Sequence, residues 1–168
     1  GKGKNLVGAF TQPARVLIDP LLLETLPEEH FVEGCAEVVK TGLLLGHPLW
    51  EHPRVEQVRR CAAFKTAVCL SDPKEQGRRA ILNLGHTFAH GLEAAGGYSG
   101  PTHGHAVALG LRAALRLSVT YCGLDQTVVS QVEEALPVSR AQVDPERAWE
   151  AMRHDKKAAE GHLPHERS

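Results

Sequence analysis

The stretch from Arg79 to Glu93 restricts the possible folds of this chain more than any other. Read as one helix, at about 100° per residue, it has an apolar face and an opposite polar face. The polar face carries a guanidinium, an amide, two imidazoles and a carboxylate, from Arg79, Asn83, His86, His90 and Glu93. Solvated faces are usually built from Lys and Glu. Two histidines four residues apart can approach one metal ion or one substrate together, although the pattern alone favours a merely solvated face equally.

Composition excludes several classes of protein. A chain of 168 residues suits one domain, or one domain with a fragment of another, and its aromatic content of 5% favours packed helices around an aliphatic core. A net charge of −1 argues against a nucleic-acid binder that works through a broad basic field. No apolar run reaches the roughly 18 residues that span a bilayer. The four cysteines form no CxxC pair, so we expect reduced thiols in a soluble, cytoplasmic protein.

Helical periodicity accounts for most of the remaining sequence. It predicts further helices over residues 27–46, 54–70, 102–122, 125–136 and 145–154. A short β-type run over 14–19 has nothing nearby to pair with, and is interpreted as the last piece of a sheet. The polar tail from 158 to 168 is predicted to be disordered. The expected fold is therefore mainly α, preceded by a short β segment.

Three charged residues on the first two of these helices allow two interpretations each. Glu37 and Lys40 could form an exposed ion pair worth about 0.2–0.5 kcal/mol, and the local pattern favours that interpretation. Alternatively, Glu37 is an oxygen ligand or base and Lys40 contacts an anion. Lys65 lies in the middle of an apolar stripe, so its ammonium either extends out to solvent or meets an anionic partner.

Two more histidines follow a glycine-rich loop, at the expected start of the helix over 102–122. Thr102 is a suitable N-cap, so His103 and His105 lie at a helix N-terminus, where imidazoles are kept neutral and available to a metal. A short connection between helices brings His103 back toward His86 and His90. Three histidines with a carboxylate from another helix form a credible zinc site with a position open for substrate.

Four separated motifs, in order along nearly the whole chain, resemble those of the 3-dehydroquinate synthase family. They are GKNLVGAF at 3–10, AEVVK at 36–40, NLGHTFAH at 83–90 and HGHAVALG at 103–110, followed by DKK at 155–157. Related sugar-phosphate cyclases share this framework, so a related substrate is the alternative within the enzyme class. The resemblance implies a helical C-terminal domain of the dehydroquinate synthase type, after the end of an α/β nucleotide-binding domain.

The resemblance also implies an activity. Members of the family cyclise 3-deoxy-D-arabino-heptulosonate 7-phosphate to 3-dehydroquinate and phosphate, in the shikimate pathway that leads to aromatic amino acids. They use NAD and a divalent metal, usually zinc, with Co²⁺ or another divalent ion possible. They act on a small sugar phosphate, not on nucleic acid or membranes, and are typically homodimers.

Roles for individual residues follow from the matched motifs. The resemblance makes Glu37, His86 and His103 the metal ligands, and His90 a substrate and proton-relay contact rather than a ligand. Lys40 and Arg79 join His90 in the catalytic set. The contacts to substrate are expected from Asn5, Lys40, Lys65, Arg79, Asn83, His90, His103 and Lys156. Lys4 is expected to contact the cofactor region.

The resemblance also divides the chain. Residues 1–26 correspond to the end of the N-terminal α/β domain, 27–157 to the metal- and substrate-binding domain, and 158–168 to a tail. The family enzyme is about twice as long and its N-terminal domain binds most of NAD, so we expect weak or absent turnover from this chain alone. A truncated, non-catalytic domain that binds metal or phosphate is the alternative. The family usually has Glu at the position of His105, which could act on the metal's surroundings or compete as a ligand.

Overall fold

A computed structural model describes residues 11–97, 100–137 and 143–160, with side chains to Arg153 in the last range. The chain is mainly α, as the sequence predicts, and the described residues contain no strand. The α-helices are α1 Glu28–Leu45, α2 Arg54–Ser71, α3 His86–Gly96, α4 His103–Cys122, α5 Gln126–Ala135 and α6 Pro145–Glu160. The described residues also form three 3₁₀ helices, η1 Pro20–Thr25, η2 Leu49–Glu51 and η3 Arg78–Asn83.

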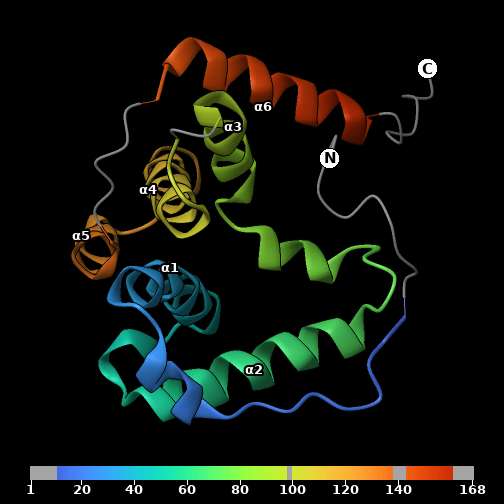
Figure 1. Cartoon of the computed structure of the whole chain (residues 1–168). Helices are drawn as coiled ribbons and strands as arrows, with labels where there is room; N and C mark the ends of the chain where they lie inside the picture. The colour runs from blue at the N-terminus through green and yellow to red at the C-terminus, as the bar shows by residue number, and fades with distance from the viewer. Residues whose placement is uncertain (1–10, 98–99, 138–142, 161–168) are drawn as a thin grey trace.

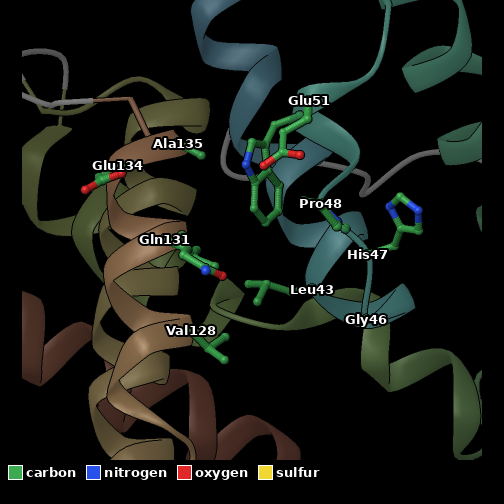
Figure 2. A pocket seen from close by; sticks show the side chains of 12 residues that line it. Leu43, Gly46, His47, Pro48, Glu51, Val128, Gln131, Glu134 and Ala135 are labelled. Atoms are coloured by element: carbon green, nitrogen blue, oxygen red, sulfur yellow. The ribbon is translucent and has the colours of Figure 1, made fainter.

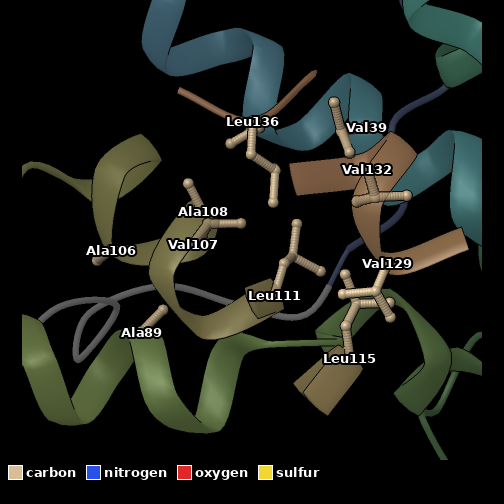
Figure 3. Close-up of a cluster of buried hydrophobic side chains, with 11 residues drawn as sticks. Val39, Ala89, Ala106, Val107, Ala108, Leu111, Leu115, Val129, Val132 and Leu136 are labelled. Atoms are coloured by element: carbon tan, nitrogen blue, oxygen red, sulfur yellow. The ribbon is translucent and has the colours of Figure 1, made fainter. Parts of the chain in front are cut away.

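The helices are stacked in the order α6, α3, α4, α1, α2 (Figure 1). α5 packs beside α4, and η3 connects the far end of α2 to the start of α3. The core lies where α1, α3, α4 and α5 meet, and it is built from Ala, Val and Leu, as the low aromatic content predicts (Figure 3). Its fully buried members include Val39, Ala89, Val107, Leu111, Val129 and Val132. Within the described residues, no helix has both the length and the apolar character needed to cross a membrane.

Local signals in the sequence set several of the helix ends. α1 starts after Pro27 and ends at Gly46, which adopts the left-handed conformation with φ 65°. α4 ends in the same way at Gly123, with φ 70°. The carboxylate of Asp125 accepts a hydrogen bond of 2.8 Å from the backbone N–H of Thr127 and caps α5. The predicted bounds of these helices are confirmed to within about one residue.

The N-terminal segment differs from the prediction, because the run from Ala14 to Asp19 forms no strand. A strand needs a neighbour to satisfy its backbone N–H and C=O groups. The side chains of Val16, Leu17 and Ile18 are instead 66%, 85% and 52% exposed. At the other end, α6 continues past the expected end near 154 and takes in 158–160 of the predicted tail, and the rest of the tail is outside the described residues.

The helix expected over 79–93 is interrupted, which corrects the first prediction of the sequence analysis. η3 ends at Asn83, Leu84 leaves the helical region with ψ 124°, and Gly85 has φ 78° before α3 starts at His86. The cause is the close approach of α4. A Cβ on Gly85 would lie 2.9 Å from the backbone N of Leu111, and a Cβ on Gly110 would overlap the carbonyl oxygen of Gly85. Arg79 and Asn83 are therefore on a different element from the two histidines.

Candidate active site

Three side chains of metal-ligating type converge from three helices. Glu37 comes from the middle of α1, while His86 and His103 are the first residues of α3 and α4. One ligand atom from each lies within 4.8 Å of the other two. Oε1 of Glu37 is 3.5 Å from Nε2 of His86 and 3.7 Å from Nε2 of His103. The stacking order of α3, α4 and α1 is what brings together residues so distant in sequence.

Each of the two histidines also makes a polar contact through Nδ1, the ring nitrogen that does not face Glu37. Nδ1 of His86 lies 3.2 Å from the backbone carbonyl oxygen of Leu84, in the break before α3. Nδ1 of His103 lies 3.2 Å from Oε1 of Glu93, on the last turns of α3. Both imidazoles therefore turn Nε2 toward the carboxylate of Glu37.

The carboxylate of Glu37 is strongly biased toward its ionised form. Burial on its own would raise the pKa of Glu37, but hydrogen bonds with His86 and Lys40, and the charge of Lys40, bring it down to about 2. Nζ of Lys40 lies 2.5 Å from Oε2 of Glu37, and the residue is only 6% exposed. The pair is therefore not the solvated surface pair that the local sequence pattern favoured.

The three residues fit a divalent transition metal by their chemistry, and Glu37 also fits by its distance from each histidine. Two imidazole nitrogens and one carboxylate oxygen form a common zinc donor set, with one position left for substrate. At metal–ligand distances of about 2.0–2.2 Å, the ligand atoms of a tetrahedral site lie roughly 3.3–3.6 Å apart. The distances of 3.5 and 3.7 Å from Glu37 Oε1 are within a few tenths of an ångström of that range.

The three residues lie at the wall of a cleft of about 700 Å³ between α1, α2 and η3. Besides them, its polar lining consists of Lys40, Thr41, Cys61, Lys65, Glu75, Arg79 and Asn83. Lys65 is exposed and also borders this cleft, so both interpretations of that lysine, extension into solvent and contact with an anion, stay open. With Lys40, Lys65 and Arg79 on its walls, the cleft can bind an anion beside a metal.

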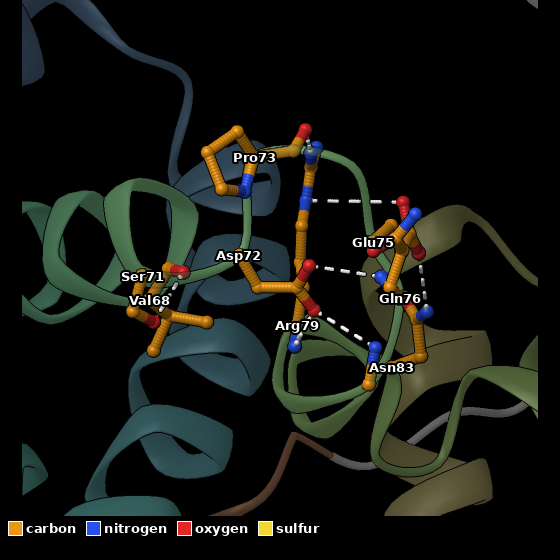
Figure 4. Close-up of polar contacts among 9 residues, drawn as sticks. Val68, Ser71, Asp72, Pro73, Glu75, Gln76, Arg79 and Asn83 are labelled. Atoms are coloured by element: carbon orange, nitrogen blue, oxygen red, sulfur yellow. Dashed lines mark hydrogen bonds and ion pairs between the residues drawn. The ribbon is translucent and has the colours of Figure 1, made fainter.

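The segment between α2 and η3 is organised by one buried carboxylate (Figure 4). Asp72 accepts hydrogen bonds from the backbone N–H groups of Gln76, Gly77 and Arg79, at 2.8, 2.9 and 3.0 Å. These bonds, first of all the one from Arg79, lower the pKa of Asp72. The result is a fixed turn that places Arg79 on the wall of the cleft.

Within that turn, Glu75 faces the cationic and amide groups of η3. Its carboxylate lies 3.8 Å from Nε of Arg79 and 3.4 Å from Nδ2 of Asn83 (Figure 4). Glu75 has φ 54°, a left-handed conformation that residues other than glycine rarely adopt. An anionic ligand bound by Arg79 and Asn83 therefore has to share or replace the contacts that Glu75 makes.

Sequence comparison decides the family. The sequence model described as "3-dehydroquinate synthase C-terminal" matches residues 34–158, and "3-dehydroquinate synthase N-terminal" matches residues 1–33. This chain belongs to the 3-dehydroquinate synthase family. The boundary between the two matched ranges lies inside α1.

Curated relatives agree with this assignment. The chain is 42% identical over 150 residues to a 3-dehydroquinate synthase of Legionella pneumophila (strain Corby), covering 80% of this chain and 40% of the relative. It is 40% identical over 181 residues to that of Pseudomonas putida (strain W619), covering 96% and 50%. It is 37% identical over 175 residues to the 3-dehydroquinate synthase of Citrifermentans bemidjiense, and the match covers 93% of this chain and 48% of the relative. The chain thus spans about half the length of the curated relatives it matches.

Not all of the residues that the dehydroquinate synthase motifs single out can be placed. The structure brings Glu37, His86, His103, Lys40, Lys65, Arg79 and Asn83 to one cleft. His90 lies one turn beyond His86 on α3, with its side chain exposed and the two ring centroids 5.7 Å apart. Lys4 and Asn5 are outside the described residues, and so is the side chain of Lys156.

His105 does not join the group of three ligand-type residues that the described part of the chain presents. Its Nδ1 lies 2.9 Å from Oγ1 of Thr102, the N-cap residue of α4, and it points to that local contact instead. The expectation that His105 could be a rival ligand therefore receives no support from the positions of the side chains.

Sequence reasoning gave no role to three acidic residues that shape the site. The sequence places Glu93 on the polar face, seven residues or two turns after His86, but no pattern pairs it with His103. Asp72 and Glu75 lie in a polar turn whose conformation no periodicity reveals. The only sequence signal for these two residues is the Asp-Pro pair at 72–73, which indicates a turn.

Proposed function

We propose that this chain is the metal- and substrate-binding portion of a 3-dehydroquinate synthase. Such an enzyme, a phosphate-eliminating lyase of the shikimate pathway, cyclises 3-deoxy-D-arabino-heptulosonate 7-phosphate to 3-dehydroquinate with release of phosphate. The observation that carries the proposal is the convergence of Glu37, His86 and His103 beside a cleft that Lys65 and Arg79 border. Family membership supports this reaction among the many that a metal and an anion site could serve.

Glu37, His86 and His103 would hold the divalent metal, zinc or an ion such as Co²⁺. When bound, that ion supplies a Lewis acid for oxygen atoms of the substrate. Lys40 acts on the same site from inside the protein. Together with the hydrogen bond from His86, its buried ammonium lowers the pKa of Glu37, so the carboxylate is ionised and able to bind a cation well below neutral pH.

The cationic residues would bind and orient the substrate. Lys65 from α2 and Arg79 from η3 line the same cleft, so they can contact the phosphate and carboxylate of one small molecule. Asn83 can donate to a hydroxyl or carboxylate beside Arg79. Asn5 and Lys156 are further substrate contacts in this proposal.

His90 is proposed to move protons rather than to bind the metal. It is exposed and lies edge-on to the ring of His86, beyond the three residues of the proposed metal site. An imidazole at that position can exchange protons with a substrate and with solvent. Lys40 and Arg79 would assist by stabilising negative charge on the substrate.

The cofactor and assembly belong to the same proposal. NAD would be bound mostly by the N-terminal half that the relatives possess, with Lys4 contributing from this chain, and the complete protein would be a homodimer. The hydride acceptor is therefore expected to need that second half, so turnover by these residues alone should be weak or absent.

Reconstitution tests the proposal. The chain would be incubated with zinc, NAD and the heptulosonate phosphate, with and without a separately expressed N-terminal half of a relative, and phosphate release measured. We expect release only when both halves are present. Metal binding without any rescue would support a non-catalytic domain instead, and rescue with a different sugar phosphate would indicate a related cyclase.

A further inference from the structure

Hydrogen bonding fixes which nitrogen of each site histidine is free to bind a metal. A carbonyl or carboxylate oxygen can only accept, so a ring nitrogen bonded to it carries the hydrogen. Nδ1 of His86 faces the carbonyl oxygen of Leu84, and Nδ1 of His103 faces the carboxylate of Glu93. Each Nδ1 is therefore a donor. Metal binding requires Nε2 to give up any hydrogen that it shares with Glu37, and the lone pair of the neutral imidazole is then on Nε2, the atom directed at Glu37.

The two histidines depend on these contacts to different degrees. The side chain of His86 is 13% exposed, so packing around the start of α3 restrains its ring as well. The side chain of His103 is 47% exposed at the start of α4. A half-exposed imidazole can rotate between staggered rotamers unless a partner holds it. Glu93, only 22% exposed and on a different helix, is positioned to be that partner.

We propose that Glu93 is a positioning residue for the metal site. Its carboxylate holds the Nδ1–H of His103 and thereby aims Nε2 at the ion, an inference that rests on the metal site of the proposed function. A carboxylate behind a ligating histidine also makes the imidazole a stronger donor, since it stabilises the positive charge that metal binding draws onto the ring. The site would thus have one histidine backed by a neutral carbonyl and one backed by a charged group.

Zinc and cobalt titrations of the full chain test this inference. Four proteins would be compared: the wild type, Glu93→Ala, Glu93→Gln and the control Glu134→Gln, an exposed glutamate of α5 away from the cleft. We expect Glu93→Ala to weaken the affinity about 10- to 100-fold, the usual range for lost outer contacts of a ligating histidine. Glu93→Gln should lose less, because its amide oxygen still accepts from Nδ1, and the control should match the wild type.

A second measurement, made without metal, tests whether Glu93 holds the Nδ1–H of His103. Two-bond ¹H–¹⁵N correlation spectra of the metal-free protein report which nitrogen of His103 carries the hydrogen. We expect the Nδ1–H form in the wild type and a shift toward the Nε2–H form in Glu93→Ala, with unchanged far-ultraviolet circular dichroism. In the cobalt protein, the visible bands should change for Glu93→Ala and be largely restored for Glu93→Gln.

The outcomes separate this inference from the proposed function. A wild-type chain that binds no zinc overturns the metal site itself. A wild type that binds zinc, together with a Glu93→Ala variant of equal affinity, overturns the role of Glu93 alone. So does an Nε2–H form of His103 in the wild type, because the hydrogen bond to Glu93 would then not exist.

Discussion

Two hollows of similar size, among those in the described part of the chain, differ in the residues that line them. The cleft beside Glu37 has a volume of about 700 Å³, and a second cavity between α1, η2 and α5 has about 610 Å³ (Figure 2). The second is lined by apolar residues such as Leu43 and Val128, and by the polar residues His47, Glu51, Gln131 and Glu134. The first gathers two imidazoles, two carboxylates, two lysines and an arginine.

The contrast teaches that size does not identify a functional site in this chain. The gathering of charged groups is the better indicator. Bringing such groups together costs hydration free energy, and packing alone does not require it. At the cleft, the buried ammonium of Lys40 is paired with the carboxylate of Glu37, whose pKa its partners lower to about 2. No comparable pair lies among the described residues of the second cavity.

The largest effect is expected from removing a proposed ligand. His86→Ala and Glu37→Ala should each weaken zinc binding by more than about 100-fold, because each takes away one of three donor atoms. The matched control is His47→Ala, a histidine of the second cavity, which should leave affinity unchanged. Isothermal titration with zinc measures all three. Equal losses for His47→Ala and His86→Ala would abolish the distinction between the two hollows.

His90→Ala should separate metal binding from chemistry. We expect its zinc affinity to stay within about twofold of the wild type, while phosphate release by the reconstituted two-half protein falls about 10²- to 10⁴-fold, the usual contribution of an acid–base group. If His90→Ala loses zinc as severely as His86→Ala, the two histidines act as a chelating pair and the assigned roles are wrong.

Lys65→Ala should have a smaller effect, confined to the substrate. Losing one charge-assisted contact is expected to raise the dissociation constant for the sugar phosphate about tenfold, without changing zinc affinity. Lys74→Ala, an exposed lysine that does not line the cleft, is the control. An effect of equal size at Lys74 would mean that general surface charge, not the cleft, attracts the anion.

The smallest expected effect is on thermal stability, comes from Asp72 in the turn beside the cleft, and depends on pH. Because folding lowers the pKa of Asp72, its contribution to stability is fully present above the ordinary pKa of an aspartate and is lost as pH falls through the lowered value. Asp72→Asn should lower the melting temperature by a few degrees at pH 7 and by less under acid conditions. Thermal unfolding between pH 7 and pH 3 measures this; a difference that does not shrink as the pH falls would contradict it.

Local chemistry made much of the fold predictable from the sequence. Pro27 and Gly46 bound α1, and Gly123 ends α4, because proline and glycine act on the backbone within their own neighbourhood. Thr102 occupies the N-cap position of α4 as predicted, but its side chain makes no capping hydrogen bond. The interruption at Gly85 was missed, since the approach of α4, a tertiary contact, selects its conformation.

The residues of the candidate site were predictable mainly from the family resemblance, not from local backbone chemistry. The short connection between two helices predicts that His103 lies near His86, but only the family resemblance adds Glu37 to them. The structure shows them meeting, while their role as metal ligands stays a prediction. Glu93 and Glu75 could not be assigned from sequence, because their partners lie on other elements or depend on a turn of unusual backbone geometry.

The central claim is that Glu37, His86 and His103 form one metal site, and anomalous diffraction at the zinc edge from zinc-soaked crystals tests it most directly. The account predicts a single strong peak bonded to Oε1 of Glu37 and to Nε2 of both histidines, at about 2.0–2.2 Å. A peak shared by His86 and His90 without Glu37, or no peak in the cleft at all, would contradict it.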